Sequence, residues 1–335
     1  MTTPIVHLRD VKKRPRFLAL WEKRRNSKEV HWAIECFAEM LGVFLYVYFG
    51  VGSTAGFVIG NILNQPMSSL FQVGMAYAVG ILFALGVFVF KGFPKLKAVR
   101  YITAQIIGAY IASWLVYSQW KFLIVEAEET LKAAGEAVFE ATQFTPNGPA
   151  GIFGFYLFPG QSLGRAFLNE WVNCTMIGLV LWAALDPTTY FLPPAMGPWV
   201  VALTYAACIW GFAIPGISLN TARDVGGRLM AMSVWAAGGR YAAIAALTNI
   251  PATLFAVFLY EFFLVDSDRV VTPPNLEVMN VHANHRRLRQ EQKAERRSSR
   301  VQSLVDLGDG SAHEKPSINA FEHTPGRNSV DRSNA

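Results

Sequence analysis

Charged side chains are scarce in this 335-residue sequence: Asp, Glu, Lys and Arg make up 16% of it, against 52% hydrophobic residues. Length alone would allow two water-soluble domains, but this composition favours lipid as the main solvent. The few charges are also unevenly spread. Of the 30 Lys and Arg, 9 lie in residues 1–30 and 11 in residues 266–335, so the net charge of +6 belongs mainly to the two tails.

Several common functional patterns are missing as well. The three cysteines, Cys36, Cys174 and Cys208, lie inside apolar stretches, which argues against a disulfide framework or a zinc site. No Ser/His/Asp set, metal-ligand spacing or phosphate-binding loop occurs outside the tails, so we expect no enzyme, no cofactor and no metal. The basic N-terminal residues lack the apolar core of a signal peptide, so the first span is expected to direct insertion.

What the sequence does contain is long apolar runs. Each is long enough to cross a hydrocarbon core of about 30 Å. They lie near residues 33–57, 70–90, 99–120, 165–185, 195–214 and 247–265. The sequence therefore predicts an all-α membrane protein with six transmembrane helices.

The connections between these runs predict the orientation in the membrane. Residues 91–100 contain four basic side chains, whereas residues 122–145 contain five glutamates and one lysine. The positive-inside rule then places both termini in the cytoplasm. Small residues four apart, such as Ala104, Gly108 and Ala112, would allow the helices to cross closely.

The chain is expected to divide into three parts: a basic tail at residues 1–30, a transmembrane domain at residues 31–266 and a basic tail at residues 267–335. The second tail is polar from about Thr272 and should be largely disordered, with room for a short helix near residues 285–300. Its arginines fit either anionic lipid headgroups or plain solvation.

The segment from Gly216 to Leu229 carries the most chemistry. It places Asn220, Arg223 and Asp224 in a stretch too apolar for an ordinary loop, and the apolar piece that follows is too short to span. This pattern indicates a re-entrant loop that leads into a half-helix, which membranes tolerate where the backbone lines a cavity. An arginine reaching to the membrane interface is the alternative explanation of Arg223.

This segment resembles the Gly-x-x-Leu-Asn-Pro-Ala-Arg-Asp box of the major intrinsic protein family, the aquaporins and aquaglyceroporins. Ala38-Glu39 with Gly42, Tyr101-Ile102 with Ala104-Gln105, Glu170 and Leu259-Tyr260 also match the family. The resemblance covers about residues 33–265 and is nearest to glycerol-facilitator-like members such as fungal ones. It implies a right-handed bundle of two inverted halves, assembled as a homotetramer, that conducts water, glycerol or other small neutral solutes.

The resemblance also assigns roles to individual residues. Asn220 would donate to the solute, and Arg223 would be the filter arginine beside Phe71, Cys208 and Ile217. Thr221, Ala222 and Asp224 would begin the half-helix, while the carboxylates of Glu39 and Glu170 would be buried and brace the re-entrant loops. Cys208 where water-selective members keep His, together with Asp224, favours glycerol-type permeation; Cys208 as a packing residue is the alternative.

Two departures from the family stand out. The family's first Asn-Pro-Ala loop and half-helix should lie between the second and third spans, but only residues 91–98 join them here. Thr221 also replaces the proline of the box. Loss of a half-helix would leave a costly cavity, so we expect reduced or absent conduction.

Two alternatives stay open: a non-conducting membrane protein with an assembly or regulatory role, and a chain shortened by splicing or by a faulty gene model. We expect the plasma membrane, with an endomembrane as the other option, and no nucleic-acid partner.

Overall fold

The computed structural model describes residue 11 and residues 15–25, 27–87, 95–214, 216–236 and 242–309. All regular structure in these residues is helical. In chain order the helices are α2 (Arg16–Arg25), α3 (Lys28–Ile62), α4 (Leu70–Val87), α5 (Lys95–Ala133), α6 (Glu136–Gln143), the 3-10 helix η1 (Pro149–Ile152), α7 (Leu163–Leu185), α8 (Gly197–Phe212), α9 (Thr221–Trp235), α10 (Ala242–Leu247), α11 (Asn249–Phe263) and α12 (Pro273–Asp309).

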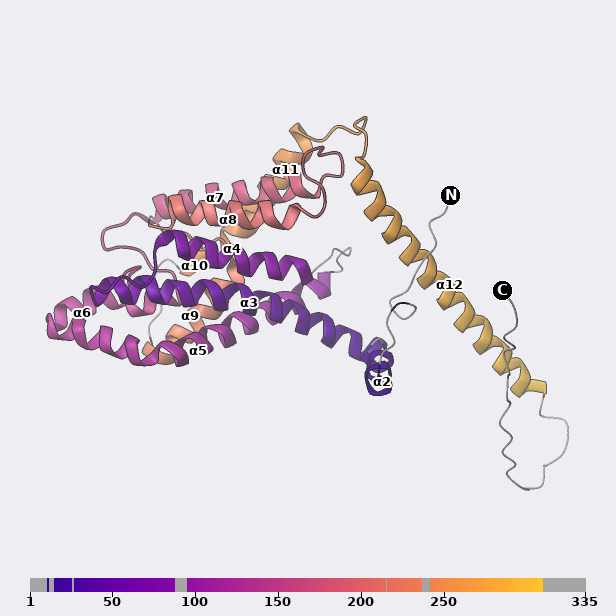
Figure 1. Cartoon of the computed structure of the whole chain (residues 1–335), viewed down its shortest axis with the longest axis horizontal. Helices are drawn as coiled ribbons and strands as arrows, with labels where there is room; N and C mark the ends of the chain where they lie inside the picture. Colours follow the sequence, from indigo (N-terminus) through magenta and orange to yellow (C-terminus); the bar gives the residue numbers. More distant parts are fainter. Residues whose placement is uncertain are drawn as a thin grey trace, which may run out of the picture. The chain divides into compact units, whose positions relative to one another are not determined.

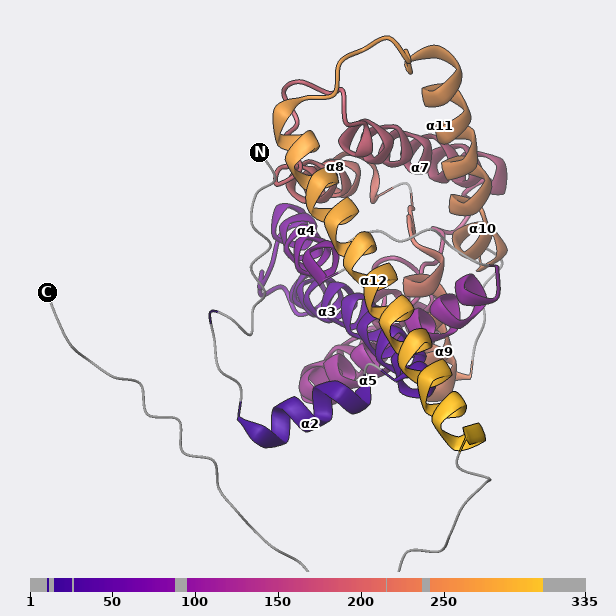
Figure 2. The ribbon, with the colours of Figure 1, turned by 90° about the vertical axis from the view of Figure 1, so that its right-hand side faces the viewer.

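The long helices form two sets, which Figures 1 and 2 show from two directions. In the first set α3 packs against α4 and α5, and in the second α7 packs against α8 and α11. Contact between α4 and α8 joins the sets. Helix α9 packs on α5 of the first set, although it follows α8 of the second set in the chain. The segment before α9 therefore passes from one set to the other.

Small residues allow the close approach of these helices. A Cβ atom added at Gly108 would lie 2.3 Å from the carbonyl oxygen of Met40, which holds α5 against α3. An added Cβ at Gly226 would lie 2.5 Å from the Cβ of Ala109, where α9 meets α5. A Cβ atom added at Gly52 of α3 would meet no atom within 4 Å, so not every small residue in these helices marks a helix contact.

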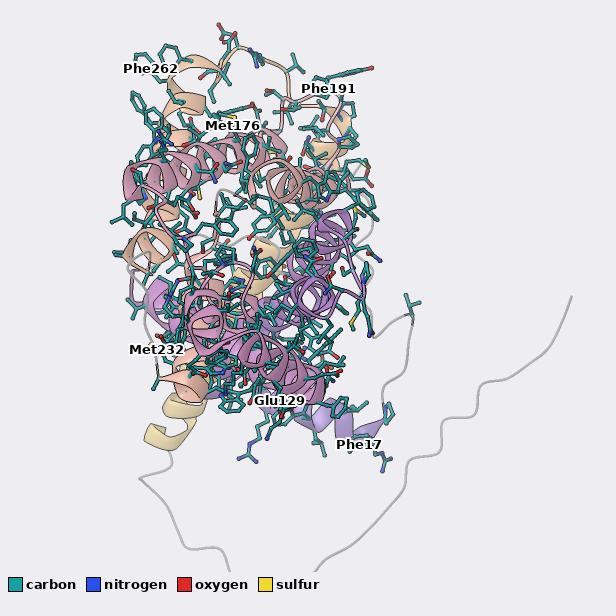
Figure 3. All side chains as sticks on the ribbon, turned by 90° about the vertical axis from the view of Figure 1, so that its left-hand side faces the viewer. Phe17, Glu129, Met176, Phe191, Met232 and Phe262 are labelled. Carbon is teal, nitrogen blue, oxygen red and sulfur yellow. The ribbon has the colours of Figure 1, made fainter. Side chains whose placement is uncertain are left out.

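Apolar surface faces outward from this bundle. Met176 on α7 and Phe262 on α11 are 46% and 68% exposed, and Figure 3 shows both at the outside. In the described residues, Val30–Ile62, Val99–Ala133 and Leu163–Leu185 are long and apolar enough to cross a membrane. Leu70–Leu82, Gly197–Phe212 and Asn249–Phe263 are shorter apolar helices. These helices are typical of an integral membrane protein.

The structure differs from expectation at the end of α5. The sequence placed a connection at residues 122–145, but α5 continues to Ala133 and α6 follows it. Ile124 and Ala127 are at most 1% exposed, so this part of α5 still packs in the core. The carboxylate of Glu128 also accepts hydrogen bonds from Gln143 Nε2 (2.9 Å) and Trp235 Nε1 (2.6 Å), which tie α5 to α6 and α9.

The C-terminal tail also differs. Helix α12 occupies much of the part expected to be disordered, and the short helix expected near residues 285–300 lies within it. Strong helix formers dominate this stretch, and Arg287 and Glu291 form an ion pair one turn apart (2.9 Å). Residues Met1–Val278 make up one compact unit and Met279–Ala335 a second.

The connection between the second and third spans is outside the described residues. Helix α4 ends at Val87 and α5 begins at Lys95. The absence of the first half-helix therefore stays a prediction.

Candidate functional site

The backbone before α9 enters the protein interior without regular secondary structure. Gly216, Ile217, Ser218 and Leu219 are all buried. Leu219 has a φ of 61°, a left-handed conformation that costs a non-glycine residue about 1–3 kcal/mol unless the surroundings impose it. Buried N–H groups in such a segment require partners, because no water reaches them.

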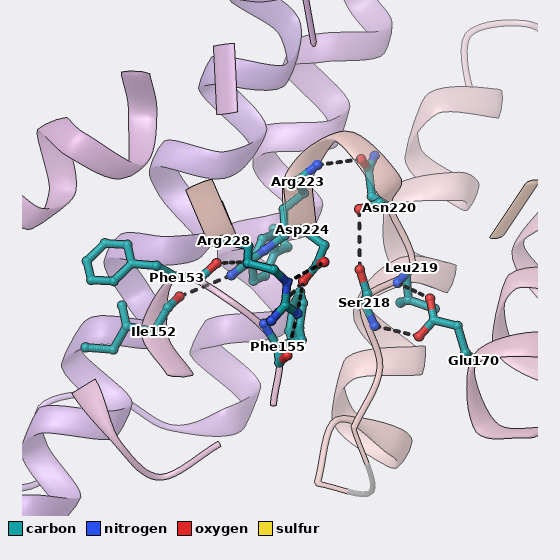
Figure 4. Close-up of polar contacts among 11 residues, drawn as sticks. Ile152, Phe153, Phe155, Glu170, Ser218, Leu219, Asn220, Arg223, Asp224 and Arg228 are labelled. Atoms are coloured by element: carbon teal, nitrogen blue, oxygen red, sulfur yellow. Dashed lines mark hydrogen bonds and ion pairs between the residues drawn. The ribbon is translucent and has the colours of Figure 1, made fainter. Parts of the chain in front are cut away.

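Glu170 of α7 supplies those partners. Its carboxylate accepts hydrogen bonds from the backbone N–H of Ser218 (2.7 Å) and of Leu219 (2.6 Å). The side chain of Glu170 is fully buried, and Figure 4 shows both bonds. The carboxylate thus fixes the turn that directs the chain into α9.

Asn220 ends the turn and caps α9. Its side-chain Oδ1 accepts the backbone N–H of Arg223 at 2.9 Å, which satisfies one of the free donors of the first helical turn. Because its oxygen is used in this way, the carboxamide turns its Nδ2 group away from the helix. Ala222 is buried behind the cap.

Arg223 is buried in the bundle with 1% of its surface exposed. Its Nε and Nη2 donate to the hydroxyl of Tyr77 (3.1 and 2.9 Å), and Nη2 also donates to the carbonyl of Ile152 (3.2 Å). Nη1 donates to the carbonyl of Phe153. The ring of Phe155 lies 4.1 Å from Cζ. The guanidinium is therefore held in the interior of the helical bundle.

Asp224 and Arg228 clamp the neighbouring chain segment. Asp224 Oδ1 accepts from Arg228 Nη2 (2.9 Å) and from the backbone N–H of Phe155 (3.2 Å). Arg228 Nη2 also donates to the carbonyl of Phe155 (2.6 Å). Burial raises the pKa of the neighbouring Tyr156, and this effect outweighs the nearby Arg228 charge, which lowers it. The segment that accepts from Arg223 is therefore fixed to α9 itself.

A cavity of about 100 Å³ lies against this arrangement. Ile217, Ser218, Phe155, Tyr77 and Tyr205 line part of its wall. Ile217, which the resemblance gives as a filter residue, thus lies beside a cavity. Neither Arg223 nor Asn220 lines this cavity, but Tyr77, which does, is hydrogen-bonded to Arg223.

These tyrosines, Tyr46 of α3, Tyr77 of α4 and Tyr205 of α8, form a tyrosine cluster. Their ring centroids are 5.2 to 6.2 Å apart, and each side chain is at most 6% exposed. The hydroxyls of Tyr46 and Tyr205 are hydrogen-bonded, and Tyr205 also donates to the carbonyl of Ser218 (3.3 Å). Two of its members, Tyr77 and Tyr205, form part of the cavity wall.

Phe71 and Cys208, the other two predicted filter residues beside Arg223, do not line this cavity. Phe71 is 61% exposed and stacks on Trp210 (centroids 5.0 Å apart), because it lies at the start of α4 on the face turned from the core. Tyr77 of the same helix contacts Arg223 instead. Cys208 is buried in the helix core, and Tyr205, one turn earlier, faces the cavity.

The sequence analysis missed the tyrosine cluster. A signal was present, since a buried tyrosine hydroxyl needs a hydrogen-bond partner, and tyrosines at three separate spans therefore indicate a shared polar site.

Glu39 is partly buried, not fully as expected. Burial along α3 begins only at Gly42, so Glu39 lies at the loosely packed end of that helix. Its carboxylate accepts from Gln105 Nε2 of α5 at 2.8 Å. Glu39 therefore links α3 to α5.

A buried arginine and a carboxylate-braced turn, set in apolar helices beside a cavity, define an integral membrane protein built around a polar site. The chain belongs to the major intrinsic protein family, whose model, described as Major intrinsic protein, matches residues 26–259. Members of this family are passive channels and not enzymes.

Similar proteins agree with this assignment. The chain is 60% identical to "Aquaporin-3" of Laccaria bicolor, over 94% of this chain and 99% of that protein. It is 30% identical to "Aquaglyceroporin-2" of Rhizophagus irregularis, over 75% of this chain and 82% of that protein. The X-ray structure of the aquaglyceroporin from Plasmodium falciparum has the same fold, with a TM-score of 0.56 at 18% identity, over 70% of this chain and 97% of that chain.

The alignment with the Laccaria protein has more positions than there are residues of this chain in it. It extends over 336 residues, whereas 94% of 335 residues is about 315, so about 20 positions have no residue of this chain opposite them.

Proposed function

We propose that this chain is a passive membrane channel for water and small neutral solutes such as glycerol, with reduced conduction. The observation that carries the proposal is the geometry of Arg223: a buried guanidinium, fixed by backbone carbonyls, beside the capped start of α9. A fixed positive charge repels cations, and its donors suit hydroxyl oxygens. The names of the similar proteins support the two solutes.

The proposed fold has six spans: α3, α4, α5, α7, α8 and α10 with α11. Helix α9 is the re-entrant half-helix. Its 15 residues extend about 22 Å at 1.5 Å per residue, less than the about 30 Å of a hydrocarbon core, and the buried turn before it lies in the interior. Basic tails support cytoplasmic termini, and the family resemblance supports a homotetramer in the plasma membrane.

In this proposal Asn220 and Arg223 contact the solute, and Ile217 forms part of the approach. The tyrosine cluster takes the places first given to Phe71 and Cys208. Thr221, Ala222 and Asp224 shape the start of α9, and Glu170 holds the turn. Glu39 has a structural role on α3.

Two observations support reduced conduction as part of this proposal. About 20 positions of the Laccaria relative have no counterpart here, which is about the length of the turn and helix at residues 216–235. Placed between α4 and α5, such a gap would remove one half-helix. Tyr77 also lines the cavity and occupies the donors of Arg223, which favours a non-conducting membrane protein as the second candidate function.

Stopped-flow measurement of purified protein in proteoliposomes tests the proposal. We expect water and glycerol fluxes above those of empty liposomes but below those of a complete aquaglyceroporin. A matched chimera, in which the corresponding segment of the Laccaria relative replaces residues 88–94, should recover flux. Flux equal to the complete channel would refute the impairment, and flux equal to empty liposomes would favour the second candidate.

A further inference from the structure

Thr221 and Asn249 make a contact that the family box does not explain. Thr221 is the first residue of α9, and its hydroxyl donates to the side-chain Oδ1 of Asn249 at 2.5 Å. Asn249 is the first residue of α11, which packs on α7. The threonine found in place of proline therefore links the start of α9 to the start of the last apolar helix.

This hydrogen bond orients the carboxamide of Asn249. Its oxygen is held by Thr221, so the Nδ2 group points away from that hydroxyl. Among the residues that the structure describes, no acceptor is bonded to this Nδ2. The side chain is partly buried, so a polar ligand that accepts a hydrogen bond from Nδ2 would be stabilised by it.

Asn220 shows the same arrangement. Its Oδ1 is occupied by the N–H of Arg223, and its Nδ2 is likewise without an acceptor in the described part of the chain. We refer to Asn220 and Asn249 as the amide pair. Asn220 precedes Thr221 in the chain, and Asn249 accepts a hydrogen bond from the Thr221 hydroxyl. Both have an occupied oxygen and an available donor.

The amide pair lies where the two sets of helices meet. Asn220 leads into α9, which packs on α5 of the first set, whereas Asn249 begins α11 of the second set. Glu170 of α7 holds the turn at the same place. The amide pair therefore brings one side-chain donor from each set of helices to this junction.

We propose that Asn249 is a solute-binding residue, with Thr221 as its positioning residue, and that it supplies a second amide donor to the oxygen of a water or polyol. The inference rests on the proposed function, in which the donor of the first half-helix is absent. It also explains a threonine at the first position of α9, because proline carries no hydroxyl to orient Asn249.

Flux measurements test the inference in a conducting chain. Asn249→Ala removes the donor, and Thr221→Val removes the orienting hydroxyl at nearly constant shape. We expect glycerol permeability about 3- to 10-fold lower for Asn249→Ala, the equivalent of one lost hydrogen bond, and a smaller loss for Thr221→Val. Asn61→Ala, at the exposed end of α3, is the matched control and should equal the parent. Unchanged permeability of Asn249→Ala would overturn the inference.

Thiol modification tests it independently of conduction. Asn249→Cys should react with a small water-soluble methanethiosulfonate reagent, and glycerol should slow the reaction. The parent gives the background from its three cysteines, and Ala245→Cys, at a fully buried position, should stay unmodified. If the parent conducts nothing, the proposed function fails, but protection of Asn249→Cys by glycerol would still support the site. Absence of modification or of protection would then overturn it.

Discussion

Replacing Glu170 by glutamine should destabilise the turn before α9. Both carboxylate oxygens accept backbone N–H groups, from Ser218 at 2.7 Å and Leu219 at 2.6 Å. Glutamine keeps one acceptor but presents an NH₂ group to the other donor. One buried N–H is then left without a partner, and the left-handed conformation of Leu219 loses its restraint.

The size of the effect follows from these bonds. A hydrogen bond to a charged group contributes about 1.5–3 kcal/mol, and an unpaired buried donor costs about 1–3 kcal/mol. A neutral glutamine avoids the desolvation cost of a buried carboxylate, which offsets part of this loss. We expect a net destabilisation of about 2 kcal/mol, or a Tm lower by about 4–8 °C for a domain of this size.

Thermal unfolding in detergent, followed by intrinsic tryptophan fluorescence, measures the shift. Glu39→Gln is the matched control, because Glu39 is partly buried and bonded to the side chain of Gln105. It should change the Tm by less than half as much. Equal shifts for the two variants, or a Glu170→Gln protein as stable as the parent, would refute the role given to Glu170.

Three further predictions concern other parts of the chain. Gly226→Leu should abolish a monodisperse peak in size-exclusion chromatography, because no side chain fits between α9 and α5, whereas Gly52→Ala should elute like the parent. Arg223→Val should remove the buried cation and admit cations, seen as an ion leak in liposomes loaded with a potassium-sensitive dye; no leak would contradict its role. Burial raises the pKa of Asp186, but hydrogen bonds, chiefly from Thr188, outweigh this and hold it below its ordinary value of 3.8. The ionised carboxylate therefore contributes its whole stabilisation at pH values above the ordinary pKa, and this stabilisation is lost as the pH falls through the lower pKa of the folded protein. The Tm of the parent should thus fall more steeply below about pH 4 than the Tm of Asp186→Asn.

The sequence predicts the centre of the site better than its surroundings. Asn220 and Arg223 are three residues apart in one recognisable box, and a helix start brings them together without any knowledge of the tertiary structure. Phe71 and Cys208, which do not line the cavity, depend on more distant structure. Their positions depend on the rotational phase of α4 and α8, which a hydrophobic run cannot reveal when nearly every residue in it is apolar.

Helix lengths were also hard to predict. The acidic residues after position 122 suggested a connection, but the buried face of α5 continues to Ala127, and Glu128 binds the ends of two other helices. Mean hydropathy averages the buried face of a helix with its solvent-exposed face. It therefore indicates where the lipid-facing part of a helix ends, but not where the helix itself ends.

The clamp formed by Asp224 and Arg228 on the backbone of Phe155 has a consequence for evolution of this chain. The carbonyls that receive Arg223 belong to residues 152 and 153, in a stretch between helices where insertions are usually tolerated. Here an inserted residue would displace the acceptors of a buried cation. The length of this stretch is therefore constrained as tightly as that of any helix. Close homologues should differ here by substitutions and not by insertions or deletions.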